Sequence, residues 1–184
     1  TQPKAFGAKS IPTYLRSPYL FYEEKIKELI KPQIRVLEIG SGMGLHTYSL
    51  IKTGAHVTAT DISSNSLKVL ENRMKEVDRK GEGILKTEIA DMELLPFENA
   101  SFDVVASAGS LSYGKALKVD QGIRRVLKPT GFFICVDSLN NNPIYKLNRY
   151  IHYLNGDRSK ITIQNMPTIK RLKALKQNYS ELEI

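Results

Sequence analysis

Short apolar runs alternate with amphipathic segments along the middle of the chain. The runs are rich in aliphatic and β-branched residues, which is typical of buried strands. They cover residues 35–39, 56–60, 84–90, 102–106 and 132–136. Between them, apolar residues recur at the spacing of one helix face, first at Leu67, Leu70, Met74 and Val77 and then at Val119, Ile123, Val126 and Leu127. Strands that alternate with helices indicate βαβ units, so we predict an α/β fold with a mainly parallel, twisted sheet and helices on both faces.

Further elements are predicted on both sides of these units. Residues 19–30 form a helix before the first strand, and the second amphipathic helix ends at Pro129 and Gly131. After a turn-prone loop over 138–143, the residues Ile144, Leu147, Ile151 and Leu154 share one helix face, and another helix is expected over 168–176. A chain of 184 residues is the usual size of one domain, so we expect a single core.

Composition narrows the class of protein. Hydrophobic residues make up 41% and charged residues 25% of the chain, which is ordinary for a soluble globular domain. No window reaches the roughly 18 consecutive apolar residues of a membrane span, and the first ten residues lack the apolar core of a secretory signal. The single cysteine, Cys135, cannot form an internal disulfide, and no Cys/His cluster has zinc spacing. We therefore expect a cytoplasmic, metal-free protein in which Cys135 belongs to the core.

The net charge of +8 is confined to the two ends of the chain. Residues 36–139 hold 12 Lys and Arg against 13 Asp and Glu, whereas residues 1–35 hold 7 against 3 and residues 140–184 hold 8 against 3. A nearly neutral centre with basic flanks is not the pattern of a uniformly basic nucleic-acid-binding protein.

A glycine-rich turn follows the first strand, with the sequence Glu38-Ile-Gly40-Ser-Gly42-Met-Gly44. In open α/β sheets the ligand lies at the carboxyl ends of the strands, where glycines allow close approach and a helix N-terminus offers free N–H groups. The dinucleotide fingerprint Gly-x-Gly-x-x-Gly would need a glycine at Leu45. The spacing therefore disfavours a nicotinamide-dependent oxidoreductase and favours another nucleoside ligand.

Together with this turn, four further segments resemble the class I S-adenosylmethionine-dependent methyltransferases. They are Asp61 at the end of the second strand, the segments 90–97 and 101–105, and Leu127-Lys-Pro-Thr-Gly131, in which Thr130 replaces one glycine of the family's turn. They follow the family's order within residues 18–137, and the nearest branch is the small-molecule enzymes of ubiquinone and menaquinone biosynthesis. The resemblance implies the Rossmann-like methyltransferase fold, S-adenosyl-L-methionine as cofactor and S-adenosyl-L-homocysteine as product.

The resemblance also implies a set of cofactor-binding residues. Glu38 is expected near the methionine ammonium group, Asp61 on the ribose hydroxyls and Asp91 at the adenine amino group. Ile62 is expected against the adenine, and Ser107 and Ala108 on the methyl-transfer face. The full set is Glu38, Gly40, Ser41, Gly42, Gly44, Asp61, Ile62, Asp91, Met92 and Ser107.

Structural alternatives exist for these positions. The glycines could simply form a tight turn, and Asp61 could be the N-cap of the following helix. Ile62 could belong to the core, and Asp91 could be a turn residue before Pro96. Asp103 we assign to structure, as an acceptor for nearby backbone groups.

The catalytic residues stay unassigned, because a sulfonium is already an activated methyl donor and the protein's main task is alignment. Many members of the family carry Leu-His-His after the fourth strand, where this chain has Leu111-Ser-Tyr113. Tyr113 is a candidate for orienting the acceptor, and His152 is either a substrate-side or a surface residue. His46 is expected to be a packing or surface residue.

The basic flanks suggest what is methylated. In this fold the N-terminal helix and the segment after the fifth strand usually hold the acceptor, and these are the flanks that carry the excess charge. Tyrosine and arginine occur together there, as in Tyr19, Tyr145, Arg149 and Arg158. We expect methylation at oxygen of a small anionic or sugar-containing acceptor.

Three alternatives remain beside this function. One is C- or N-methylation of a quinone-like or other metabolite, and another is a non-catalytic nucleoside-binding module. The third is that the basic flanks do not bind the acceptor but form a solvated surface or a surface that faces anionic lipid. Nucleic-acid methylation is disfavoured, because the Asn/Asp-Pro-Pro-Tyr/Phe signature is missing.

The domain 1–184 is expected to comprise an N-terminal cap (1–34), a cofactor-binding core (35–137) and an acceptor-side region (138–184). The family's sheet has seven strands, and only residues 179–184 remain for the last two. The sixth strand would lack a partner, so we expect either that the sequence is trimmed, as Thr1 in place of Met also suggests, or that another chain covers this sheet edge in an oligomer.

Overall fold

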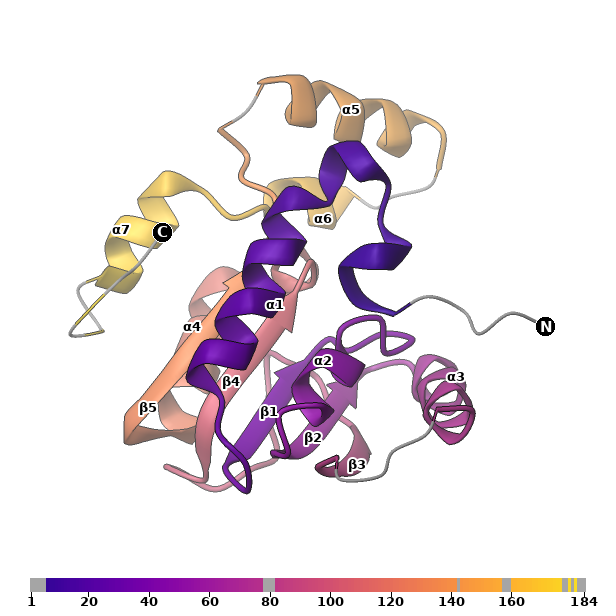
Figure 1. Cartoon of the computed structure of the whole chain (residues 1–184). Coiled ribbons are helices and arrows are strands. Elements are labelled where there is room, and N and C mark those ends of the chain that lie inside the picture. Colours follow the sequence, from indigo (N-terminus) through magenta and orange to yellow (C-terminus); the bar gives the residue numbers. More distant parts are fainter. Residues whose placement is uncertain are drawn as a thin grey trace.

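A five-stranded parallel sheet in the order β3-β2-β1-β4-β5 forms the centre of the molecule (Figure 1). The structure, a computed structural model, describes residues 6–77, 82–141, 143–156 and 160–176 together with Tyr179 and Glu181. The strands are β1 (Arg35–Ile39), β2 (His56–Asp61), β3 (Ile84–Ile89), β4 (Phe102–Ala108) and β5 (Leu127–Val136). Each neighbouring pair is parallel. The predicted α/β fold and all five predicted strands are therefore confirmed.

Seven α-helices and three short 3-10 helices surround the sheet in the described residues. The α-helices are α1 (Ser17–Leu29), α2 (Thr47–Ile51), α3 (Ser64–Lys75), α4 (Ala116–Val126), α5 (Pro143–Leu154), α6 (Lys160–Gln164) and α7 (Ile169–Lys176). The 3-10 helices are η1 (Gly7–Ser10), η2 (Thr13–Leu15) and η3 (Leu111–Tyr113). The helices predicted from apolar spacing are present within a few residues. With only five residues, α6 is too short to show a helical period in the sequence.

The turn before the fifth strand differs from the prediction. Helix α4 ends at Val126, and β5 begins at Leu127, so Pro129 and Gly131 lie within the strand and do not end the helix. The pairing of β4 with β5 shifts in register between Phe102 and Val104, which accommodates these residues. A Cβ at Gly131 would lie 2.8 Å from the carbonyl oxygen of Asp103, so the glycine permits the close approach of the two strands.

Two apolar clusters cover the two faces of the sheet. One joins α1, α2 and α3 to the strands and includes Ile26 and Leu70, and the other joins α4 to the strands and includes Ile123. Neighbouring residues of β1 point to opposite faces, since Val36 belongs to the first cluster and Leu37 to the second. The prediction of helices on both faces is therefore confirmed.

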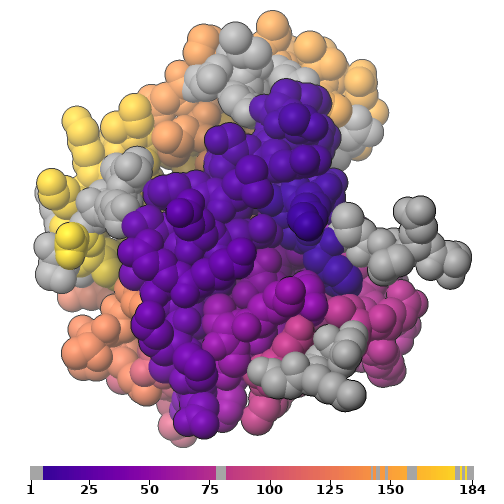
Figure 2. Space-filling view, in the orientation of Figure 1, coloured from indigo at the N-terminus to yellow at the C-terminus, as the bar shows by residue number. Residues whose placement is uncertain are grey.

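The start of α1 and helices α5 and α6 lie beyond the carboxyl ends of the strands, whereas the rest of α1 runs along one face of the sheet (Figure 1). In the space-filling view the indigo N-terminal segment covers much of the face shown and lies below the orange residues of α5 (Figure 2). Helix α7 is fixed to α4 by Arg171, which donates from Nη2 and Nε to the two carboxylate oxygens of Asp120 at 2.6 and 3.1 Å. This ion pair fixes the C-terminal helix α7 to the side of the sheet that α4 covers.

Strand β5 is an edge strand, and Cys135 is exposed on it. The prediction that Cys135 belongs to the core is therefore wrong. The residue does lie in the predicted strand, but its side chain is exposed. Most of the segment 179–184 lies outside the described residues, so coverage of this edge by a sixth strand or another chain stays a prediction. Among the described residues, no helix is both long and apolar enough to cross a bilayer.

Candidate functional site

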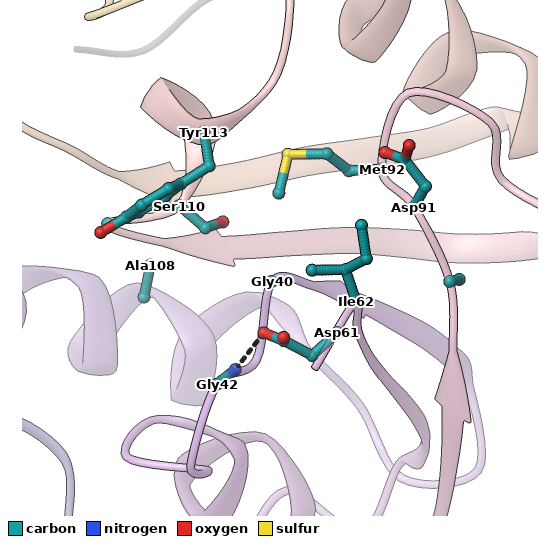
Figure 3. Close-up of a pocket in the computed structure, with 11 residues that line it drawn as sticks. Gly40, Gly42, Asp61, Ile62, Asp91, Met92, Ala108, Ser110 and Tyr113 are labelled. Carbon is teal, nitrogen blue, oxygen red and sulfur yellow. Dashed lines mark hydrogen bonds between the residues drawn. The ribbon is translucent and has the colours of Figure 1, made fainter. Parts of the chain in front are cut away.

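A pocket of about 390 Å³ opens where the strand order reverses between β1 and β4 (Figure 3). Its walls come from the loops after four strands, at their carboxyl ends. The lining residues are Gly40, Gly42, Asp61, Ile62, Ala90, Asp91, Met92, Ala108, Gly109, Ser110 and Tyr113. This is the place at which open α/β sheets bind their ligands.

The glycine loop after β1 has left-handed backbone conformations that suit glycine. The φ angles of Gly40 and Gly42 are 64° and 52°. A Cβ at Gly40 would lie 2.4 Å from the Cβ of Ser110, whereas a Cβ at Gly42 would meet no atom within 4 Å. Gly40 therefore permits the loop after β1 to pack closely against Ser110, and the backbone of Gly42 is accessible from the pocket because no side chain covers it. Gly44 lies outside the pocket lining, and a Cβ there would meet Leu70 at 2.7 Å.

The carboxylate of Asp61 connects the ends of β1 and β2. Its Oδ2 accepts a hydrogen bond from the backbone N–H of Gly42 at 2.8 Å, and its Oδ1 accepts one from Ser63 at 2.8 Å. The N-cap of α3 is Ser63, whose hydroxyl accepts from the N–H of Ser66. Because each carboxylate oxygen can accept a further hydrogen bond, Asp61 orders the loop and can still bind a ligand in the pocket.

Glu38 is buried below the glycine loop and does not line the pocket. Its side chain is 2% exposed, and its Oε2 accepts a hydrogen bond from the Thr47 hydroxyl at 2.6 Å. Burial raises the pKa of Glu38 to about 7; the Thr47 hydrogen bond opposes this rise, and the negative charge of Asp61 adds to it. A cationic group nearby would favour the ionised form of this carboxyl group.

Three predicted residues lie together at one end of the pocket. Ile62 is 72% exposed, so the alternative that it belongs to the core is wrong. Asp91 and Met92 follow β3, and Oδ1 of Asp91 accepts a hydrogen bond from the N–H of Glu93 at 2.8 Å. Asp91 therefore stabilises its own turn and also borders the pocket.

At the opposite end, the pocket wall begins one residue beyond Ser107, the first of the two residues predicted there. Ser107 is fully buried, and its hydroxyl contacts that of Ser110 at 2.7 Å, which in turn donates to the carbonyl oxygen of Ile39 at 3.0 Å. Of the two residues predicted for this wall, Ala108 lines the pocket and Ser107 does not. Gly109 and Ser110 complete the wall, because β4 continues two residues further than the apolar run suggested. Ala90, Gly109 and Ser110 were missed, since only the position of each strand end identifies them.

The remaining candidates have structural surroundings. His46 is 6% exposed, which confirms the prediction of a packing residue, and burial lowers its pKa. Asp103 accepts hydrogen bonds from the N–H of Arg35 at 2.9 Å and from Nζ of Lys128 at 2.7 Å, as the structural assignment predicted. His152 is half-buried on α5. Arg158 and the side chain of Tyr145 lie outside the described residues.

In the parts of the chain that the structure describes, no group of three or more His, Cys, Asp or Glu side chains is arranged to hold a metal ion.

Comparison with known proteins connects this architecture to one family. Residues 37–135 match the family described as methyltransferase domain. A sterol 4-C-methyltransferase of Caenorhabditis elegans is 30% identical over 152 residues, which are 82% of this chain and 44% of the relative. A demethylmenaquinone methyltransferase of Clavibacter sepedonicus is 34% identical over 114 residues, which are 61% of this chain and 44% of the relative.

A solved structure shows the same fold. The SAM-dependent methyltransferase from Aquifex aeolicus superposes with a TM-score of 0.62 at 15% identity, over 85% of this chain and 77% of that chain. The present chain spans less than half the length of the two curated relatives, since each match covers 44% of the relative. These matches confirm the predicted resemblance to methyltransferases, and the chain belongs to the methyltransferase domain family.

Proposed function

We propose that this domain binds S-adenosylmethionine in the pocket between β1 and β4 and transfers its methyl group to a small molecule. The observation that carries the proposal is the Asp61 carboxylate, which is bonded to the N–H of Gly42 beside open space. A carboxylate with spare acceptor capacity next to bare backbone suits a ribose with two hydroxyl groups. The pocket volume of about 390 Å³ leaves room for a nucleoside.

Each predicted residue has a role in this proposal. Asp61 accepts the ribose hydroxyls, Ile62 and Met92 contact the adenine ring, and Asp91 accepts from its amino group. Glu38 compensates the ammonium charge from below the loop, and Ser107 acts through Ser110. The loop is formed by Gly40, Ser41, Gly42 and Gly44.

The chemistry requires orientation more than activation. When bound, S-adenosylmethionine supplies a methyl group that is already activated by the sulfonium. The residues of the pocket hold the reacting partners in line and exclude water, which is the main contribution expected from the protein. Tyr113 is 58% exposed at the pocket and is suited to orient an acceptor.

We further propose that the acceptor is a small anionic or sugar-containing molecule that is methylated at oxygen. The described α5 residues contain one buried side chain, Arg149, which is 8% exposed. It acts electrostatically on Asp137, whose Oδ2 accepts a hydrogen bond from the N–H of Leu111 in η3 at 2.9 Å. Tyr113 also belongs to η3. The positive charge of Arg149 therefore lies near the side of the pocket that we assign to the acceptor, through Asp137 and Leu111.

A second candidate is C-methylation of a metabolite. The name of one relative, a sterol 4-C-methyltransferase, specifies carbon as the site of transfer. Methylation of a carbon acid needs a general base. The described pocket lining contains no histidine or lysine, so the candidates for this base are its titratable side chains, Asp61, Asp91 and Tyr113.

The test of the proposed function is turnover. Purified protein is incubated with methyl-labelled S-adenosylmethionine and a mixed pool of metabolites, and labelled products are separated by chromatography. We expect label in a small molecule, and mass spectrometry then distinguishes O-methyl from C-methyl and N-methyl products. Cofactor binding without any labelled product would instead favour a non-catalytic nucleoside-binding module.

Replacing Asp61 by alanine tests the cofactor site. The variant loses the hydrogen bonds to Gly42 and Ser63 as well as the proposed ribose contacts. We expect a loss of about 3 kcal/mol, roughly a hundredfold in affinity for S-adenosylmethionine, measured by calorimetry. Asp103→Ala is the matched control, because it removes comparable bonds at the other end of the sheet. Unchanged binding by the Asp61 variant would refute the assignment.

The raised pKa of Glu38 predicts a pH-dependent stability. Between about pH 4.5 and pH 7 the unfolded chain loses this proton while the folded chain retains it, so the free energy of unfolding falls as the pH rises. A full shift corresponds to about 3 kcal/mol. Urea unfolding at several pH values should show this decline in the wild type and a flatter profile in Glu38→Gln. The exposed Glu98→Gln serves as control, and parallel profiles of wild type and Glu38→Gln would contradict the prediction.

Arg149 tests the anionic acceptor. With the acceptor found by the turnover screen, Arg149→Ala should raise the acceptor KM about tenfold and leave the affinity for S-adenosylmethionine unchanged, and Arg158→Ala should act in the same direction. Added salt should weaken acceptor binding more than cofactor binding. Arg149→Lys separates the loss of charge from the loss of packing, and the exposed Lys146→Ala on the same helix is the control. If neither variant nor salt affects the acceptor KM, the basic flanks are only surface.

A further inference from the structure

The phenol of Tyr19, on the first turns of α1, lies near Gly109, a residue of the pocket lining. A Cβ built on Gly109 would have the Tyr19 hydroxyl oxygen as its one neighbour within 4 Å among the described residues, at 3.4 Å. Gly109 lines the pocket and has a φ of 71°. The space above this glycine is therefore open, and a hydroxyl from a distant part of the sequence lies across it.

The ring of Tyr19 is held by an aromatic contact. It stacks on the imidazole of His46, with ring centroids 5.0 Å apart and an interplanar angle of 12°. The ring of Tyr22, one helical turn further along α1, packs edge-on against the same imidazole at 6.0 Å and 86°. His46 lies between the glycine loop and α2, so this contact connects α1 to the loop that forms the pocket floor.

His46 lies beside Glu23 without a direct hydrogen bond between the two side chains. Its Nδ1 lies 3.8 Å from Oε1 of Glu23, and the same oxygen accepts hydrogen bonds from the N–H of Ala8 at 2.7 Å and from the hydroxyl of Ser49 at 3.2 Å. Gly7 permits this arrangement, since a Cβ there would lie 1.9 Å from that oxygen. Glu23 therefore joins the N-terminal segment, α1 and α2 at one point.

The position of Tyr19 identifies the end of the pocket that it serves. Asp91 and Met92 border the end assigned to the adenine, whereas Gly109 lies at the β4 end, and Thr47, the neighbour of His46, donates to Glu38. Tyr19 thus lies at the end of the pocket away from the adenine. In the proposed binding mode the amino-acid portion of the cofactor reaches this end, because Glu38 is assigned to its ammonium group. That portion carries a carboxylate, but the described lining residues include two carboxylates and no cationic side chain.

We propose that the Tyr19 hydroxyl donates a hydrogen bond to the carboxylate of the cofactor's amino-acid end, with His46 and Glu23 as positioning residues. The proposal rests on the proposed binding of S-adenosylmethionine in this pocket. It gives the N-terminal helix a role in binding the cofactor, in addition to the acceptor role expected from its charge.

The test compares two ligands that differ at this end. S-adenosylhomocysteine carries the amino-acid carboxylate, whereas 5′-methylthioadenosine retains the adenosine and the thioether sulfur but lacks the carboxylate together with the ammonium group. For Tyr19→Phe, calorimetry should show about a tenfold loss of affinity for S-adenosylhomocysteine and no change for methylthioadenosine. Tyr14→Phe is the matched control, because Tyr14 is 84% exposed in the same N-terminal segment. It should bind both ligands as the wild type does.

The positioning residues need a readout that a loss of folding would not reproduce. His46→Ala removes the stacking partner and should show the same selective loss for S-adenosylhomocysteine, while His46→Phe should restore most of it. Glu23→Gln should show a smaller loss of the same kind. A purely structural role would weaken both ligands together or lower the stability of the protein without any selectivity.

Two outcomes overturn the proposal, and they differ from failure of the cofactor site. The proposal is wrong if Tyr19→Phe weakens both ligands equally or neither, or if Tyr113→Phe alone shows the selective loss. In those cases the proposed cofactor site would still be supported if the wild type binds S-adenosylhomocysteine and the Asp61→Ala variant does not. If the wild type binds neither ligand, the proposed function and this inference are both wrong.

Discussion

The hydrogen bond from the backbone N–H of Gly42 to the Asp61 carboxylate is the interaction on which the site depends. It joins the loop after β1 to the end of β2 at 2.8 Å. The bond occurs with a left-handed backbone at Gly42, which costs other residues about 1 kcal/mol or more and glycine little. Once this loop is fixed, Gly40 lies against Ser110 and the bare backbone of Gly42 faces the pocket. The shape of the cavity thus follows from two glycines and one carboxylate.

The parallel register gives the same region its charge. Glu38 and Asp61 lie near the carboxyl ends of the neighbouring strands β1 and β2, with Ile39 paired to Thr60. Two acidic groups therefore lie close together at the carboxyl end of the sheet. The cost is visible in Glu38, whose pKa is raised to about 7, mainly by burial and to a smaller extent by the charge of Asp61. A site with this acidic character and no cationic side chain in its described lining favours a cationic ligand, and a sulfonium with an ammonium group has that character.

Local patterns account for what the sequence predicted well. The five strands, the glycine loop and the acids after β2 and β3 are visible within short windows, because each depends on neighbours a few residues away. Ser110 and Gly109 were missed because β4 is extended by its pairing with β5, where Ala108 meets Val136. The exposure of Cys135 and the contact of Tyr19 with His46 also depend on residues distant in sequence. Periodicity carries no information about such contacts.

The two halves of the site are therefore constrained to different degrees. The cofactor half is built from strand ends whose positions are set by a closely packed sheet, so its geometry follows from the fold. The proposed acceptor half includes α5, in which Arg149 is the one buried side chain among the described residues. Its link to the pocket passes through the Asp137 carboxylate and the N–H of Leu111. Substitutions on such helices disturb the core little, so acceptor preference can change while the cofactor site stays the same.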